Sequence, residues 1–547
     1  MTAEHIPEAR IEDIHRLYRT RQLTPAELVA YYLRRIEALD LSTEAGPPFN
    51  CIVCVSPHVR EEAQALTDDI ARRGVTKPLH GVPVWAKDNI PVEGLPTTCG
   101  CLALEPGVAA ADAPLIRNLR SAGAIIMGKV GMTELSLGVS PYSSMSGRIG
   151  NAFDARNPPG GSSNGSAVAV SLNFGMLAVG VDDCGSITYP AAVNSCVGLR
   201  PTIGLVSPTG LFSYSHTETT PGPIARSVAD AARMLDALAV PASEAAYSDV
   251  RDLGSIRGIR IGVLAAIDPI EVMSEVPGSI RQAFADRLAD IKAAGAIVID
   301  PLRLDGVRWA RKSGLEHYNA QVASLRARTK DPRTPRQLYS SNSASPVVRR
   351  FRRHPLFGFG PPFGLPNIHA AAYRRVIRHN RTVFARLLAS AAVDAVIAVT
   401  TSAPSRIATL AQIPHLTIPA GCVPADQELA ASGFVEGSTV PWGLSILAGP
   451  GRDRELLAIG LALEQTLGGR VVPRPPGAGH EAASGELDIE QFNRFKKDLA
   501  HRSSRSLQLD ADGREYVHPT ADEFRALVRE VTSATRNRLA VRSGTGA

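Results

Sequence analysis

No run of apolar residues in this sequence approaches the ~18 residues that a membrane-spanning helix needs. The N-terminus is charged from Glu4 onward, so it also lacks the apolar stretch of a secretory signal peptide. Apolar residues make up 44% of the 547-residue chain, which excludes an intrinsically disordered protein. We therefore expect a cytoplasmic, globular protein with a large hydrophobic core.

Cysteine is scarce, and the seven cysteines form an odd number. A long chain with so few cysteines does not indicate a disulfide framework. Cys51-x-x-Cys54 and Cys99-x-Cys101 look like halves of a zinc site, but no second pair of Cys or His follows at a suitable spacing. We predict reduced, mostly buried thiols, no metal site and no cofactor.

Lysine is rarer still, with eight Lys against 51 Arg. A lysine within an apolar stretch therefore differs from the general composition, and Lys87 directly follows the apolar segment GVPVWA at residues 81–86. Burial disfavours the ammonium form, so a buried Lys87 supplies a neutral amine that can act as a base. Considered alone, Lys87 fits an ordinary salt bridge equally well.

Acidic residues are nearly missing from residues 325–390, which hold fourteen Lys and Arg and one acid, Asp331. This segment carries +13, while the whole chain carries +6 and the remainder −7. Two interpretations stay open: a solvated helix face, or a surface that attracts an anionic substrate or an acidic partner such as a carrier protein. No nucleic-acid-binding motif accompanies the segment, so we do not expect a nucleic-acid partner.

Short apolar strands alternate with amphipathic helices along most of the chain, which predicts an α/β fold with a sheet covered by helices. Helices are expected in two parts of 9–40 and at 57–73, 112–123, 167–174, 277–295, 367–391 and 453–466. Strands are expected at 81–86, 124–128, 177–181, 258–264, 393–399 and 415–419. Thr24-Pro25-Ala26-Glu27 has the pattern of a helix start with a capping box.

Two segments rich in small residues interrupt this pattern. Residues 147–165 are rich in Gly, Pro, Asn and Ser, and a loop of this length inside a compact domain is more often functional than a simple connector. The segment 160–166, GGSSNGS, offers hydroxyls and backbone N–H groups to an oxyanion or a phosphate. The segment 182–186, DDCGS, is either a turn that directs N–H groups at a reaction centre or a tight turn with no further role.

Other serine and nucleotide chemistries do not fit the sequence. Gly161-Ser162-Ser163-Asn164-Gly165 matches G-x-S-x-G, but the preceding ARNPPG cannot be the strand that this motif requires. No S-x-x-K motif ends at any lysine, and Gly128-Lys129 is followed by Val130 rather than Ser or Thr. No NAD fingerprint follows a predicted strand.

An ordered series of segments resembles the amidase signature family. The matching segments are GVPVWAKDNIPVEGLPTTCG, LIRNLRSAGAIIMGKVGMTELSLG, GNAFDARNPPGGSSNGSAVAVSLNFGMLAVGVDDCGSITYP, SHTETTPGPIARSVADAARML, IPHLTIPAGCVP and VPWGLSILAGPGRDRELLAIGLALEQ. The resemblance covers about residues 8–473 and is weakest across 300–390. It implies one large domain at 1–473, with a central mixed, twisted sheet and helices on both faces. Residues 325–390 would be a variable insertion at the substrate entrance, and 474–547 a polar C-terminal extension.

The resemblance also implies a Ser–cis-Ser–Lys triad. Ser186 would be the nucleophile, Ser162 would follow a cis peptide bond and relay the proton, and Lys87 would be the base. The implied oxyanion hole consists of the backbone N–H groups of Asp183, Cys184, Gly185 and Ser186. Ser163 would support Lys87 by a hydrogen bond, and Asp182 would hold the loop.

Three positions depart from the family pattern. Cys184 replaces a glycine, which brings a Cβ atom close to the nucleophile. Thr188 replaces an arginine and becomes a candidate substrate-binding residue. Asn164 replaces a smaller residue.

Phe351, Phe357, Phe359 and Phe363 lie in the Gly- and Pro-rich part of the basic segment. They form either an apolar wall over the substrate, with Phe357 and Phe359 as the first candidates, or a surface loop packed on its own aromatics.

The sequence therefore predicts an amidase that hydrolyses a linear carboxamide of a small molecule through an acyl-Ser186 intermediate. An acyltransferase, an amide-forming enzyme or an amidotransferase subunit would use the same acyl-enzyme. A non-catalytic binding protein is a third possibility, and a homodimer stays open as an assembly state.

Overall fold

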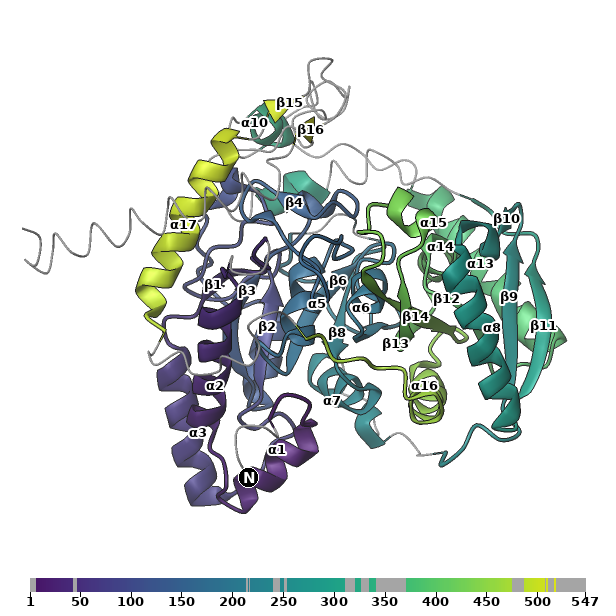
Figure 1. The fold of residues 1–547 in the computed structure, drawn as a ribbon, viewed down its shortest axis with the longest axis horizontal. Helices are drawn as coiled ribbons and strands as arrows, with labels where there is room; N and C mark the ends of the chain where they lie inside the picture. Colours follow the sequence, from purple (N-terminus) through teal and green to yellow (C-terminus); the bar gives the residue numbers. More distant parts are fainter. Residues whose placement is uncertain are drawn as a thin grey trace, which may run out of the picture.

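Twelve strands of this computed structural model form one mixed sheet (Figure 1). The structure describes residues 6–42, 47–212, 215, 217–239, 246–249, 253–309, 320–325, 334–340, 370–474, 487–506, 508–509 and 516–517. The strand order is β1-β3-β2-β6-β8-β7-β13-β14-β12-β9-β10, and β11 pairs with β9. The strands are β1 (Ile52–Val55), β2 (Pro83–Lys87), β3 (Ile125–Val130), β6 (Leu177–Asp182), β7 (Val197–Arg200), β8 (Thr220–Ala225), β9 (Arg260–Ile267), β10 (Ile270–Glu271), β11 (Ile297–Leu304), β12 (Ala395–Val399), β13 (His415–Pro424) and β14 (Thr439–Leu447).

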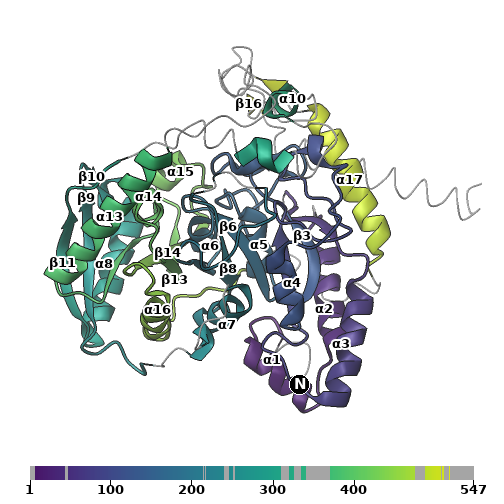
Figure 2. The same cartoon turned by 180° about the vertical axis from the view of Figure 1, so that it is seen from behind.

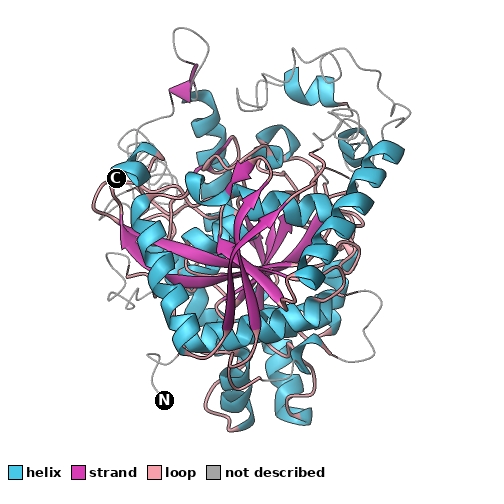
Figure 3. Cartoon of the chain, turned by 90° about the vertical axis from the view of Figure 1, so that its right-hand side faces the viewer, coloured by secondary structure: helices cyan, strands magenta, loops and turns pink. Residues whose placement is uncertain are grey.

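Helices surround this sheet, and Figure 3 shows the twisted strands at the centre with helices around them. The longer helices are α1 (Ile11–Arg19), α2 (Pro25–Leu39), α3 (Val59–Arg73), α4 (Pro114–Ser121), α5 (Asn164–Ser171), α7 (Val228–Leu238), α8 (Gly278–Ala293), α13 (Ala370–Ser390), α14 (Ser402–Ala411), α16 (Asp453–Leu467) and α17 (Ile489–Ser506). Shorter elements are α6 (Thr188–Val193), α10 (Pro335–Ser340), α15 (Gln427–Ala431) and the strand pairs β4 (Tyr142–Ser143) with β5 (Gly147–Arg148) and β15 (Gln508–Leu509) with β16 (Tyr516–Val517). None of the described helices is long and apolar enough to cross a membrane.

Neighbouring positions of β13 show that helices cover both faces of the sheet. Leu416 packs against Gly460 of α16, where an added Cβ would lie 2.2 Å from the leucine side chain. Thr417 packs beside Gly443, which also touches Ala192 of α6. Because successive side chains of a strand point to opposite faces, α16 and α6 lie on different sides of the sheet. The predicted α/β fold with helices on both faces is confirmed.

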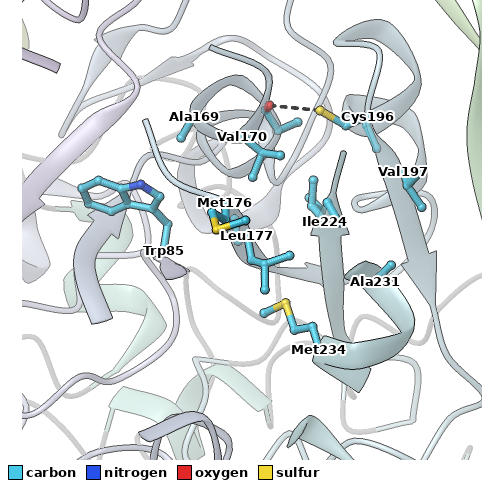
Figure 4. Close-up of a cluster of buried hydrophobic side chains, with 14 of the residues drawn as sticks. Trp85, Ala169, Val170, Met176, Leu177, Cys196, Val197, Ile224, Ala231 and Met234 are labelled. Carbon is cyan, nitrogen blue, oxygen red and sulfur yellow. Dashed lines mark hydrogen bonds between the residues drawn. The ribbon is translucent and has the colours of Figure 1, made fainter. Parts of the chain in front are cut away.

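The core is continuous between the sheet and these helices. Figure 4 shows the part where side chains of β2, β6 and β8 meet helix α7, with Trp85, Leu177, Ile224 and Met234 among them. The indole nitrogen of Trp85 donates to the carbonyl of Phe174 at 2.9 Å, so its one polar atom is satisfied despite full burial. This packing fixes β2, which ends at Lys87, and β6, which leads into the turn at 182–186.

The predicted start of α2 has its capping box. Thr24 Oγ1 accepts from the N–H of Glu27, and the Glu27 carboxylate accepts from the N–H of Thr24. By contrast, α5 begins at Asn164, three residues before the predicted start at 167. The serines of the loop therefore lie directly at the start of a helix. The strands of the sheet that were not among the predicted strands are β1, β7, β8, β10, β11 and β14.

Helix α17 packs along β1, the strand at one edge of the sheet (Figure 1). Figure 2 shows α17 from behind, on the same side of the molecule as α2 and α3. The side chain of Asn493 accepts from the N–H of Val55 and donates to its carbonyl, both at 2.8 Å, as a neighbouring strand would. The buried amine of Lys496 bonds Asp40 at 3.1 Å and Asn50 at 2.5 Å. This polar segment is therefore joined to the sheet by specific contacts.

Candidate active site

Lys87 and Ser162 meet inside the molecule, where neither residue is exposed. Lys87 is the last residue of β2, and its Nζ donates to Ser162 Oγ at 2.8 Å and to the carbonyl of Val181 in β6 at 3.0 Å. Strands β2 and β6 are parallel neighbours, so the end of β2 lies beside the end of β6. The peptide bond between Gly161 and Ser162 is cis. The geometry thus places an amine directly on a serine hydroxyl.

The surroundings of Lys87 favour its neutral form. Burial lowers the pKa of Lys87 to about 8, and the carboxylates of Asp183 and Asp182 partly oppose this shift. With a pKa near this value, roughly a tenth of the molecules carry a neutral amine at pH 7. The amine is therefore available as a base close to neutral pH.

Ser163 supports this arrangement indirectly. Its hydroxyl donates to the carbonyl of Val181 and accepts from the N–H of the same residue, each at 3.2 Å. Lys87 donates to that same carbonyl. The predicted hydrogen bond between Ser163 and Lys87 is thus replaced by a carbonyl that both residues share.

Asp182 ends β6 and organises the turn that follows. Its carboxylate accepts from the N–H of Gly185 at 3.0 Å and of Ile187 at 2.7 Å. Arg200 of β7, itself buried, holds the same carboxylate at 2.9 Å. The charge of Asp182 is therefore compensated, and the carboxylate fixes the shape of the turn from within.

The N–H groups of this turn differ in their availability. That of Gly185 is occupied by Asp182, whereas those of Asp183 and Ser186 donate to no residue that the structure describes. Gly185 has a φ of +86°, and Cys184 stays outside the positive-φ region. A glycine is therefore needed at position 185 for its backbone angle, while the cysteine at 184 fits without backbone strain.

Ser186 is 9% exposed, whereas Lys87, Ser162 and Asp182 are fully buried. Its carbonyl accepts from the N–H of Ser163 at 3.1 Å, which ties the turn to the serine-rich loop. Within the described part of the chain, its hydroxyl has no hydrogen-bond partner. The hydroxyl is thus free to meet a ligand.

Helix α14 also contacts the turn at 182–186, and its residues were not among those predicted for the site. Thr409 Oγ1 donates to the carbonyl of Asp183 at 3.1 Å. Ser405 packs so close to Gly185 that a Cβ there would lie 2.8 Å from its hydroxyl oxygen. Thr219 donates a hydrogen bond to the Asp183 carboxylate. Arg200, a charge at the end of the apolar strand β7, had a recognisable signal, whereas the residues of α14 had none.

A cavity of about 360 Å³ opens beside the turn. Cys184 and Gly185 form one part of its wall, and Gly161 lies next to them. The rest is mostly apolar and comes from elements far apart in the sequence: Val139, Tyr189, Ala192, Val193, Val276, Pro277, Ile280, Val399, Leu429, Phe434, Val440, Pro441 and Trp442. The polar contributions are neutral, and the described lining holds no charged side chain.

The other residues that the sequence singled out have different positions. Thr188 is fully buried, and its neighbour Tyr189 lines the cavity instead. Phe351, Phe357, Phe359 and Phe363 fall outside the described residues. The carboxamide of Asn164 approaches Thr133 Oγ1 at 3.5 Å and accepts from the N–H of Gly165. All seven cysteines are free thiols, and Cys184 is the exposed one.

Comparison with known proteins agrees with this fold. A sequence model described as Amidase matches residues 27–457. The subunit designated A of the glutamyl-tRNA(Gln) amidotransferase from Symbiobacterium thermophilum is 29% identical over 83% of this chain and 95% of its own length. Its counterpart from Deinococcus radiodurans is 36% identical over 52% of this chain, which spans 58% of that relative. The structure of native peptide amidase from Stenotrophomonas maltophilia superposes with a TM-score of 0.70 at 28% identity, over 86% of this chain and 99% of that chain.

The structure thus has the fold of an α/β amide-processing enzyme. The chain belongs to the amidase signature family.

Proposed function

We propose that this protein is a serine-dependent amidase that hydrolyses a carboxamide through an acyl-Ser186 intermediate. The observation that carries the proposal is the buried amine of Lys87 on the hydroxyl of Ser162, with a pKa of about 8. An amine whose pKa is lowered in this way can lose its proton close to neutral pH and act as a base.

Each step assigns the proton to a stated atom. Neutral Lys87 takes the proton of Ser162 Oγ, which takes that of Ser186 Oγ, and the Ser186 oxygen attacks the amide carbon. The C–N bond then breaks, and the leaving nitrogen receives the proton back through Ser162. Water attacks the acyl-Ser186 ester by the same relay and releases the carboxylic acid.

We assign the N–H groups of Asp183 and Ser186 as donors to the negative oxygen of the tetrahedral intermediate. Neither donates to a described residue, so a substrate oxygen replaces no existing bond. Gly185 contributes through its backbone shape, because its own N–H is held by Asp182. Pre-aligned backbone donors of this kind are each worth roughly 3–4 kcal/mol in the transition state.

The cavity supports an uncharged substrate. Its described lining is mostly apolar, so an aromatic or aliphatic group gains favourable burial there. A charged group would lose its hydration with no opposite charge beside it.

An amidotransferase subunit is the second candidate, and the names of the relatives favour it. If glutamine were the ammonia donor, its α-ammonium and α-carboxylate would need charged partners. Among the described residues that line the cavity, none is charged. We therefore rank hydrolysis of a neutral amide first.

A substrate panel separates the two candidates. The purified chain is incubated with phenylacetamide, hexanamide and glutamine, each with and without hydroxylamine as a competing amine. We expect hydrolysis of both neutral amides and a kcat/KM for glutamine that is at least about 100-fold lower. This ratio corresponds to about 2.7 kcal/mol, which is a modest free-energy cost for burying a zwitterion in an apolar cavity. Glutamine turnover equal to or above that of the neutral amides would overturn the assignment.

A further inference from the structure

A second cavity, of about 420 Å³, lies away from the candidate active site. Helix α13 contributes Arg374, Arg378 and Arg381 to its lining, and Thr217 and Gln412 come from other parts of the chain. Positions 374, 378 and 381 are spaced four and three residues apart, which places them on one face of the helix. The two cavities have no lining residue in common.

Arg374, Arg378 and Arg381 lack the ion-pair partners that some other arginines of the protein have. Arg120, Arg200 and Arg470, for example, each hold a carboxylate within 3.0 Å. The guanidinium groups of the three cavity arginines form no ion pair and no hydrogen bond with any residue in the described part of the chain. Helix α13 contains no acidic residue at all. Among the described residues, no ion pair therefore compensates the charge of these three arginines.

The form of this site indicates the kind of ligand. Each guanidinium presents several N–H donors in a rigid plane, suited to the oxygens of a phosphate or a carboxylate. Three such groups facing one concave space repel each other until an anion occupies it. A cavity of about 420 Å³ suits a small molecule rather than the flat surface of a macromolecule.

Helix α14 connects this cavity to the candidate active site. Its first turn contributes Ser402 and Ser405 to the active-site cavity, while Gln412, directly after its last residue, lines the arginine cavity. Gln412 Nε2 donates to the carbonyl of Thr217 at 2.8 Å. Between these ends, Thr409 holds the carbonyl of Asp183.

We propose that the cavity formed by Arg374, Arg378 and Arg381 binds a compact oxyanion with at least two negative charges, such as a phosphate-bearing small molecule. Anion binding in this cavity affects the active site through α14, because α14 contacts both this cavity and the turn that carries Ser186.

Calorimetric titration with inorganic pyrophosphate tests the binding step on the full chain. Wild type and two variants are compared at 150 mM NaCl: Arg378→Gln removes a cavity arginine, and Arg375→Gln removes an exposed arginine of α13 outside the cavity lining. We expect binding to wild type and Arg375→Gln, and at least about tenfold weaker binding to Arg378→Gln. No binding to wild type, or equal loss in the two variants, overturns the site. This readout does not depend on catalysis, so its failure is distinct from failure of the proposed amidase activity.

Measurements of kcat/KM test whether the arginine cavity is connected to the active site through α14. Pyrophosphate at a saturating concentration should change kcat/KM at least about threefold for wild type and Arg375→Gln, and leave Arg378→Gln unaffected. Binding without any change in kcat/KM would overturn the connection to the active site.

Discussion

The amine of Lys87 lies 2.8 Å from the hydroxyl of Ser162, and no carboxylate lies within ion-pair distance of it in the described structure. Two other described lysines are buried, Lys129 and Lys496, and each pairs with a buried aspartate, at 3.3 and 3.1 Å. Burial alone is thus shared by three lysines. The absence of an ion-pair partner distinguishes Lys87 and allows it to lose its proton.

This contrast predicts opposite effects for two matched substitutions. Lys87→Met removes the amine and keeps the bulk of the side chain, so kcat should fall at least about 10³-fold with the melting temperature unchanged or higher. Lys129→Met leaves Asp88 buried without its counter-charge, so stability should fall by about 3–5 kcal/mol while kcat changes little. Steady-state kinetics and thermal unfolding on both variants measure this. Near-normal activity of Lys87→Met would disprove its role as the base.

The pH dependence of kcat/KM should report the amine of Lys87. Because the neutral amine is the active form, kcat/KM should rise with pH and level off, with a midpoint near the pKa of about 8. The carboxylate of Asp183 favours the ammonium form and raises this pKa. Asp183→Asn removes that charge, so the midpoint should move to lower pH. A midpoint that stays in place or moves upward would contradict this electrostatic account.

The apolar cavity predicts an effect on KM rather than on kcat. Phe434 is 7% exposed and lines the cavity, so Phe434→Ala should cost about 1.5–3 kcal/mol of substrate binding. For an amide with an aromatic acyl group, KM should rise about 10- to 100-fold with kcat within a few-fold of wild type. Phe495→Ala is the control, since Phe495 is equally buried but belongs to α17. Equal KM effects in both variants would argue against this cavity as the substrate site.

The contact between α17 and β1 predicts a stability effect. Asn493→Ala leaves the N–H and carbonyl of Val55 without their partners, which should cost about 1–3 kcal/mol of unfolding free energy. Arg494→Ala removes an exposed ion pair with Glu490 and should change stability by less than about 0.5 kcal/mol. Urea unfolding measures both values. Equal stabilities of the two variants would show that the helix is only loosely attached.

Much of the fold could be predicted because its signals are local. The capping pattern at Thr24 and the apolar strand before Lys87 are both contained in a few residues. Strand β1 is one of the strands that were missed, and its four residues are too short a stretch to show a clear apolar pattern. Its place in the sheet depends on pairing with β3, far along the chain.

The site could be predicted less completely. The scarcity of lysine pointed to Lys87 but could not separate it from Lys129, since the difference is the position of Asp88 in space. The contacts of Ser405 and Thr409 with the turn join residues more than 200 positions apart, and ordinary helix residues give no local signal. The occupied N–H of Gly185 likewise depends on the folded turn, not on the residue type.

The central claim is that Ser186 becomes the acylated nucleophile through Ser162 and Lys87. Treatment with a fluorophosphonate probe, followed by intact mass and peptide mapping, tests it most directly. We expect a single adduct on Ser186, none in Ser186→Ala, and labelling at least about 100-fold slower in Ser162→Ala and Lys87→Met. An unlabelled wild-type protein, or an adduct that persists in Ser186→Ala, would contradict the account.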